Sequence, residues 1–196
     1  MPKIIGSTLA EHRLQVRTRL FSALARLMDA SGFDTLTMSD IAAEAGVGRT
    51  SVYNHFADKE SLLIGYIEHE TGQFLVDLRE ALDGVTDPEE RLRVYIRQQM
   101  ALTTTYHPAP GPDLRSIVSH DTVARLREHV REVEMLLREI LADGIAAGRL
   151  PDQDVDVVVP LVHACLTGRS RLREEEGQEH AVAATEDFVL RAVGAA

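Results

Sequence analysis

Residues 37 to 62, with the sequence TMSDIAAEAGVGRTSVYNHFADKESL, allow few folds because helix start and stop signals follow one another closely. Thr37 followed by Asp40 fits a capping box, in which each residue bonds to the other's backbone at the start of a helix. Gly46 predicts the end of that helix, where the chain needs a positive φ. Gly48 then predicts the start of a second short helix, and Asp58 the start of a third. The segment therefore predicts two short helices joined by a tight turn.

Apolar and polar residues separate to opposite sides of these two helices. Ile41, Ala42 and Ala45 fall on one side of the first helix, and Val52 and Phe56 on the inner side of the second. The outer side of the second helix is polar and consists of Arg49, Thr50, Ser51, Tyr53, Asn54 and His55. This is the layout of a DNA-binding helix-turn-helix, whose second helix enters the major groove.

The same stretch resembles the N-terminal domain of the TetR-type transcriptional regulators. The resemblance rests on Thr37 and on three ordered motifs, DIAAEAGV (40–47), VYNHF (52–56) and DKESLL (58–63). It covers the first third of the chain, and Gly48 departs from it because the family often has Ser there. The resemblance implies phosphate contacts by Thr37, Tyr53, His55 and Lys59. Arg49, Thr50 and Asn54 are the candidates for contacts with base edges, since Arg pairs bidentately with guanine and Asn with adenine.

The net charge of −10 is unevenly distributed along the chain. Residues 1–62 carry seven basic and seven acidic side chains, so the whole excess of acid lies in the remaining residues. A neutral first third with basic residues at its front is compatible with DNA binding. A helix is predicted there from about Leu9 to Ser31, ended by Gly32. Its Arg13 and Arg17 either reach DNA or form a solvated face.

The rest of the chain also reads as helices. The expected ranges are about 58–82, 87–106, 121–147, 154–173 and 180–193, with a short helix at 114–119. Three prolines within residues 107–113 predict a rigid loop, and residues 173–179 predict a polar break. The sequence therefore predicts an all-α fold of about nine helices. We expect a helix-turn-helix DNA-binding domain at 1–60 and a helical-bundle effector-binding and dimerisation domain at 61–196.

The resemblance implies that the last two long helices form a dimer interface. These helices carry more apolar residues than one buried side requires: Val155, Val158, Val159, Val162, Leu166, Phe188, Val189 and Val193. They either meet a second subunit or fill a core within the chain. A two-fold dimer would place two recognition helices in successive major grooves of a palindromic operator.

The resemblance also implies a pocket for a small-molecule effector in the helical body. Candidate lining residues combine apolar, small polar and imidazole side chains: Phe74, Met100, Thr103, Thr104, His107, His120 and His163. Together with His129, the histidines are also candidate ligands for a divalent metal such as Zn, Ni or Cu. No pair of them has the close spacing of a local metal motif, and a histidine among apolar residues is commonly an ordinary core residue.

Other functional classes lack support in the sequence. Phosphate-binding glycine loops, a G-x-S-x-G elbow and an H-E-x-x-H helix are absent, so no enzyme is predicted. The single Cys165 excludes an intrachain disulfide and, with no apolar run long enough to span a bilayer, predicts a cytoplasmic protein. We expect a homodimeric, effector-released repressor that binds double-stranded DNA. The alternatives are a DNA-binding dimer without a small-molecule effector and a metal-responsive regulator.

Overall fold

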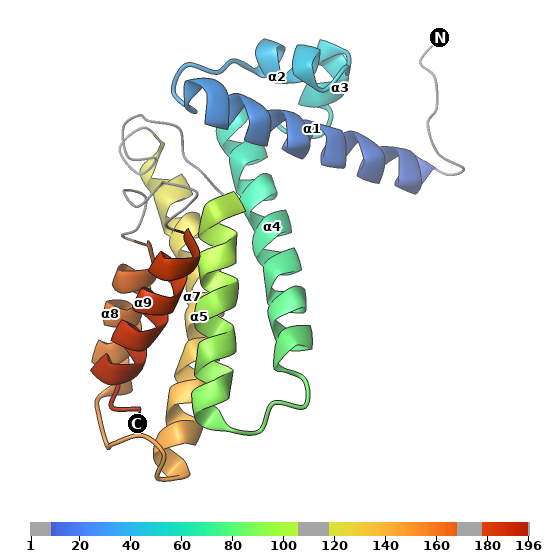
Figure 1. Ribbon diagram of the computed structural model, residues 1–196. Coiled ribbons are helices and arrows are strands. Elements are labelled where there is room, and N and C mark those ends of the chain that lie inside the picture. Colours follow the sequence, from blue (N-terminus) through green and yellow to red (C-terminus); the bar gives the residue numbers. More distant parts are fainter. Residues whose placement is uncertain (1–8, 106–117, 168–177, 196) are drawn as a thin grey trace. The chain divides into compact units, whose positions relative to one another are not determined.

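A computed structural model describes residues 9–105, 118–167 and 178–195, and every regular element in these ranges is a helix (Figure 1). The helices are α1 (Leu9–Ser31), α2 (Met38–Glu44), α3 (Arg49–Tyr53), α4 (Lys59–Leu82), α5 (Pro88–Thr105), α7 (His120–Ala146), α8 (Val155–Thr167) and α9 (Gln178–Ala192). The all-α prediction is confirmed. The expected loop at 107–113, most of the short helix at 114–119 and most of the polar break lie outside the described residues.

The chain divides into two compact units. Among the described residues, the first unit contains residues up to 69 and residues 118–127, and the second contains residues 70–105, 128–167 and 178–195. Helices α4 and α7 each contribute to both units. The predicted domain boundary after residue 60 stays a prediction.

Local signals in the first unit produce the expected helix ends. Thr37 and Asp40 form the capping box at the start of α2, and Gly46 ends this helix with a φ of 61°. Gly48 is the N-cap of α3, and Gly32 follows α1 with a φ of 79°. The side chains of Val52 and Phe56 are buried, as the apolar pattern predicts. Burial of these side chains fixes the angle between α2 and α3, which a five-residue helix could not maintain by itself.

The second unit is a helical bundle in which α5 packs against α8 and α9, and α8 against α9 (Figure 1). Its core is continuous and includes Leu78, Tyr95, Leu137 and Ile140. A polar contact also joins α5 to α9, because Arg93 and Arg97 donate to the carboxylate of the buried Glu186 at 2.7–2.9 Å. The bundle is thus held by apolar burial and by one partly buried charge cluster.

The apolar stripe on α8 and α9 divides into two sets. Residues packed into the core of the chain itself are Val159, Val162, Leu166, Val189 and Val193. Phe188 of this stripe instead has 54% of its surface exposed, and two apolar residues of α8 outside the stripe are also exposed, Val157 at 55% and Leu161 at 60%. The sequence left two roles open for this stripe, a contact with a second subunit and an intrachain core. The first set has the second of these roles. Among the described residues of α8 and α9, Val155 and Val158 are half-buried against the core, so the exposed second set is the most accessible to a partner.

None of the helices in the described ranges is both long enough and apolar enough to cross a membrane.

Candidate functional site

Helix α3 presents polar side chains on a buried apolar base. Arg49, Thr50 and Asn54 are exposed, and half of the Tyr53 surface is accessible. Val52, between them in the sequence, is completely buried. The burial of Val52 fixes the rotation of α3 about its axis and so turns the four polar side chains outward. An exposed guanidinium, hydroxyl and amide on one short helix suit contacts with base edges and phosphates.

Two of the predicted phosphate contacts have local constraints. The hydroxyl of Thr37 is 2.6 Å from Asp40 Oδ2, so part of its bonding capacity serves the cap of α2. His55 is half-buried, and its pKa is lowered by burial and by the positive charges of Arg17 and Arg13. A neutral His55 offers phosphate one N–H donor rather than a full positive charge.

Lys59 has a structural role that sequence reasoning did not find. Its ammonium donates to the carbonyl oxygens of Phe33, Asp34 and Leu36, each at 3.1 Å, and lies 4.8 Å from the ring centre of Phe33. An ammonium has three donors, so all three are used within the chain. Lys59 therefore connects the start of α4 to the loop between α1 and α2. Its predicted phosphate contact would have to compete with these bonds.

Two further arginines of α1 hold the helix-turn-helix in place. Arg19 Nη2 donates to the carbonyl oxygens of Ala45 and Gly46 at 2.6 and 3.0 Å, which satisfies the C-terminal end of α2. Arg26 pairs with Glu44 at 2.8 Å. Sequence reasoning missed both contacts, because nothing in the local sequence relates residues of α1 to groups at the end of α2 that lie 18 to 27 positions away.

Three predicted effector residues of the second unit have side chains that the structure describes. Phe74 and Met100 lie in its apolar core, with 6% and 1% of their surface exposed. His163 Nε2 is 3.0 Å from the hydroxyl of Tyr95, which also accepts a bond from Gln99 at 3.3 Å. Burial lowers the pKa of His163 and raises that of Tyr95. The core of α5 and α8 therefore contains an uncharged chain of hydrogen-bonding groups, and sequence reasoning missed Tyr95 and Gln99 as members of it.

The remaining effector candidates are not brought to this cluster by the described residues. His120 is an exposed residue at the start of α7 and belongs to the first unit. The side chains of Thr103, Thr104 and His129, and the whole of His107, lie outside the described residues. Within the described part of the chain, no group of three or more His, Cys, Asp or Glu residues is arranged to hold a metal ion.

Comparison with known proteins identifies the protein family that contains this helix-turn-helix. A model of the bacterial regulatory proteins of the tetR family matches residues 20–65. A second model, the tetracyclin repressor-like C-terminal domain, matches residues 85–189 and so covers more than half of the chain. The chain belongs to the TetR family. TetR-family proteins are DNA-binding transcriptional regulators and not enzymes, so the recognition from the first third of the sequence is confirmed.

Several relatives extend over most of the chain. The transcriptional regulator BetI of Rhizobium meliloti is 28% identical over 188 residues, which cover 91% of each chain. Among solved structures, the fatty acid degradation regulator FadR of Bacillus halodurans has a TM-score of 0.77 at 19% identity, covering 89% of this chain and 94% of its own. FadR of Bacillus subtilis, in complex with stearoyl-CoA, has a TM-score of 0.75 at 20% identity, covering 91% and 98%. At these identities the two structures support the shared fold alone.

Proposed function

We propose that this TetR-family regulator is a homodimeric repressor that binds a palindromic operator through α3 and is released by a small-molecule effector. The observation that carries the proposal is the exposed polar face of α3 above the buried Val52. Arg49, Thr50 and Asn54 read base edges, while Thr37, Tyr53 and His55 contact phosphates and set the position of the helix.

Operator binding by two substituted proteins tests this division of roles. Asn54→Ala should weaken operator binding by about 1–3 kcal/mol and relax the base preference at one position of each half-site. Tyr53→Phe should weaken binding to all sequences by about 1–2 kcal/mol, because only a hydrogen bond to phosphate is lost. Both residues are exposed, so neither change should alter folding. Unchanged operator affinity and base preference in both variants would remove α3 from the interface.

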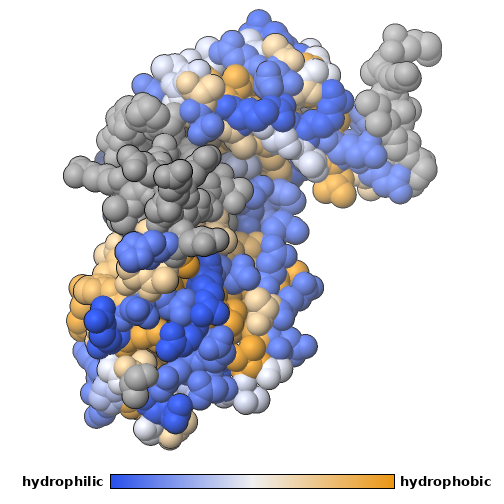
Figure 2. Space-filling view, in the orientation of Figure 1, coloured by the Kyte–Doolittle hydropathy of each residue, from blue (hydrophilic) through white to orange (hydrophobic). Residues whose placement is uncertain are grey.

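The dimer proposal rests on the exposed apolar residues of α8 and α9. Val157, Pro160, Leu161 and Ala164 are exposed at the spacing of one helix face, and α9, which packs beside α8, adds the exposed Phe188. Hydrophobic surface is also visible over α8 at the left-hand edge of Figure 2. A contiguous apolar face on two adjacent helices is typical of a protein–protein interface, and a two-fold dimer there buries it.

The effector proposal rests on the chain of Tyr95, His163 and Gln99 inside the second unit. Buried apolar side chains, including Met100, surround polar groups that have no formal charge, which is the usual composition of a small-molecule site. FadR of B. subtilis, which has the same fold, binds stearoyl-CoA. We infer that the effector of this protein contacts His163 and carries a hydrogen-bonding group within an otherwise apolar body.

Contacts at the start of α4 support transmission from the effector domain to DNA. Glu60 Oε2 accepts bonds from the amide and hydroxyl of Ser119 and from the hydroxyl of Thr122, at 2.6–3.1 Å. Ser119 directly precedes α7 and Thr122 lies in its first turn, while Lys59, the residue before Glu60, holds the loop before α2. A shift of α7 on effector binding would therefore act on α4 directly and change the position of α3.

An effector titration tests this part of the proposal. A thermal-shift screen with metabolites and with Zn²⁺ or Ni²⁺ should identify a compound that raises the melting temperature, because a ligand of the folded state stabilises it. Release of operator DNA by that compound should be altered in His163→Gln and unchanged in the control His180→Ala, which changes an exposed histidine of α9. A metal hit would favour the metal-responsive alternative, and equal release curves would return His163 to an ordinary core role.

A further inference from the structure

A hollow of about 470 Å³ in the first unit is not used by either proposed site. It lies between α1, which contributes Leu14, Arg17, Thr18 and Phe21, and the N-terminal half of α4. Hydrophobic surface is visible on the underside of the N-terminal half of α1, at the right of Figure 2. The volume lies within the usual range of small-molecule pockets, about 300–1,000 Å³.

Among the described residues, Arg17 is the charged group at this hollow that contacts aromatic rings rather than a carboxylate. Its guanidinium lies 5.6 Å from the ring centre of Phe21 and 5.2 Å from that of Phe56, and the rings restrict its orientation. Within the described residues, no carboxylate lies within ion-pair distance of Arg17. Glu68, also at the hollow, instead pairs with Arg125 at 3.2 Å. A guanidinium fixed over aromatic rings with free donors is suited to a carboxylate, which it binds with two parallel hydrogen bonds.

The walls around Arg17 are mainly apolar and aromatic. The ring of His69 stacks on Phe21 with 5.3 Å between ring centres, and Leu14 lines the hollow with 63% of its surface exposed. At Gly65, a Cβ would come within 2.8 Å of the Phe56 ring and 3.6 Å of Arg17 Nη2. A glycine inside a helix costs about 1 kcal/mol. Its presence in the N-terminal half of α4 allows Phe56 and Arg17 to approach the helix closely.

We propose that this hollow binds a small organic carboxylate, with its carboxylate on the Arg17 guanidinium and its apolar or aromatic body against Phe21 and Leu14. The apolar walls distinguish this ligand from a bare phosphate or a DNA backbone, which would leave them in water. The site is separate from the effector cluster around His163, since it is built only from residues of the first unit. Its occupation would neutralise a positive charge near His55 and so weaken DNA binding.

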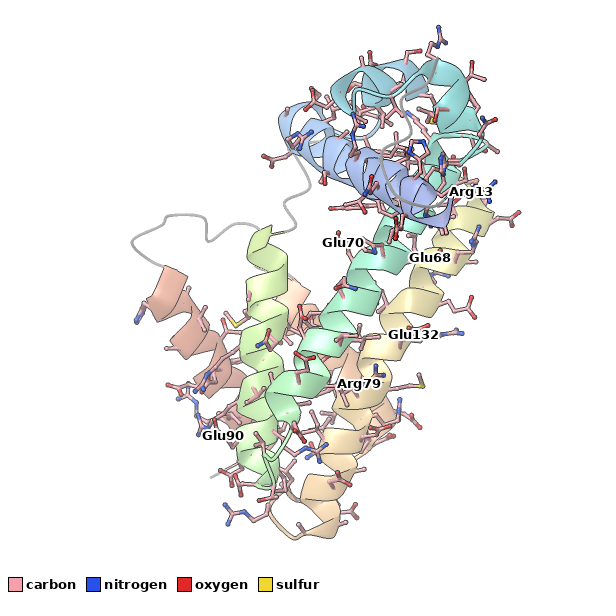
Figure 3. All side chains as sticks on the ribbon, turned by 90° about the vertical axis from the view of Figure 1, so that its right-hand side faces the viewer. Arg13, Glu68, Glu70, Arg79, Glu90 and Glu132 are labelled. Atoms are coloured by element: carbon pink, nitrogen blue, oxygen red, sulfur yellow. The ribbon has the colours of Figure 1, made fainter. Side chains whose placement is uncertain are left out.

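Binding of phenylacetate to the full-length chain, measured by calorimetry or ligand-observed NMR, tests the proposal. The uncharged phenylacetamide has a similar shape and serves as the matched probe, with inorganic phosphate as the probe for a general anion site. Arg17→Gln removes the charge, and Thr18→Trp fills the hollow from an exposed position without changing charge. Arg13→Gln is the control, because Arg13 (Figure 3) lies one turn away on α1 and does not line the hollow.

We expect phenylacetate to bind the wild type and Arg13→Gln equally, and Arg17→Gln and Thr18→Trp at least about tenfold more weakly. His163→Gln should leave phenylacetate binding unchanged, which separates this site from the proposed effector pocket. The proposal is overturned if phenylacetate does not bind, if the amide binds as well as the acid, or if phosphate binds as well as phenylacetate. Equal affinities of Arg17→Gln and Arg13→Gln, or undiminished binding to Thr18→Trp, would also overturn it.

Discussion

Residues 161 and 162 of α8 should respond to the same substitution in opposite ways, because one side chain faces outward and its neighbour faces the core. Leu161 has 60% of its surface exposed, whereas Val162 has 4%. Glutamate at position 161 should leave the fold of the subunit intact and prevent dimerisation. Glutamate at position 162 should unfold the subunit itself.

The expected magnitudes follow from these exposures. Replacing Val162 removes about 2 kcal/mol of apolar burial and adds a carboxyl group that must be desolvated or protonated at neutral pH. The total, about 5 kcal/mol, is comparable to the whole stability of many domains. Replacing Leu161 should change subunit stability by no more than about 0.5 kcal/mol. In a two-fold dimer its burial is lost twice, about 4 kcal/mol, which weakens dimerisation roughly a thousandfold.

Light scattering coupled to gel filtration gives the mass of each variant, and circular dichroism gives its helix content and melting temperature. Leu161→Glu should be a helical monomer with much weaker operator binding, and Val162→Glu should be unfolded or insoluble. A helical Leu161→Glu dimer would place the subunit interface elsewhere on the chain. A Val162→Glu protein as stable as the wild type would contradict the packing of α8 against the bundle core.

Two further substitutions, the first with a matched control, probe the turn after α2 and the contact between α5 and α9. Gly46→Val should cost about 2 kcal/mol in thermal unfolding, because it forces a β-branched residue to a φ of 61° and brings Cβ within 2.8 Å of Arg19 Nη2. Gly48→Ser is its control and should keep or raise stability, since Ser is a good N-cap and a Cβ there meets no atom within 4 Å. Glu186→Gln should lower stability by about 2 kcal/mol at pH 7, because two arginines lose a charged acceptor. Burial raises the pKa of Glu186, but the hydrogen bonds and charges of the two arginines lower it more, so the pKa lies below its usual value of 4.5. The stability that the ionised carboxylate contributes is therefore present above pH 4.5 and lost as the pH falls further. Urea denaturation should show that the variant and the wild type differ less in free energy of unfolding at pH 3 than at pH 7. An equal difference at both pH values would refute this role of the charge.

Features set by neighbouring residues could be predicted from the sequence. The bounds of α1, the capping box of Thr37 and Asp40, and the positive φ of Gly46 all match the structure. Each depends on interactions within about four positions, which the order of residues displays directly. Helix type and helix ends were therefore accessible without any knowledge of how the helices pack.

The division of the apolar stripe on α8 could not be predicted in the same way. Val157, Leu161 and Val162 are chemically alike, and helical spacing groups them without saying which side faces the bundle. The side is decided by the position of α5 and α9 around α8, which is a property of the whole fold. For this reason the sequence favoured a dimer contact over an internal core for the whole stripe, although most of its residues, Val162 among them, lie in the core of the chain itself.

Polar contacts between distant residues were the least accessible to sequence reasoning, and they change the interpretation of the site most. Lys59 matches a family position for phosphate, yet its three donors are used by carbonyl groups 23 to 26 residues earlier. Arg19 and Arg17, two residues apart on α1, differ completely, since one closes α2 and the other has no carboxylate partner among the described residues. A basic residue in a DNA-binding domain is thus not by itself evidence of a phosphate contact. Among the described residues, Lys59 and Arg19 donate to backbone carbonyl groups whereas Arg17 is exposed and contacts aromatic rings, so Arg17 is the best candidate of these three cations to bind a ligand from outside the chain.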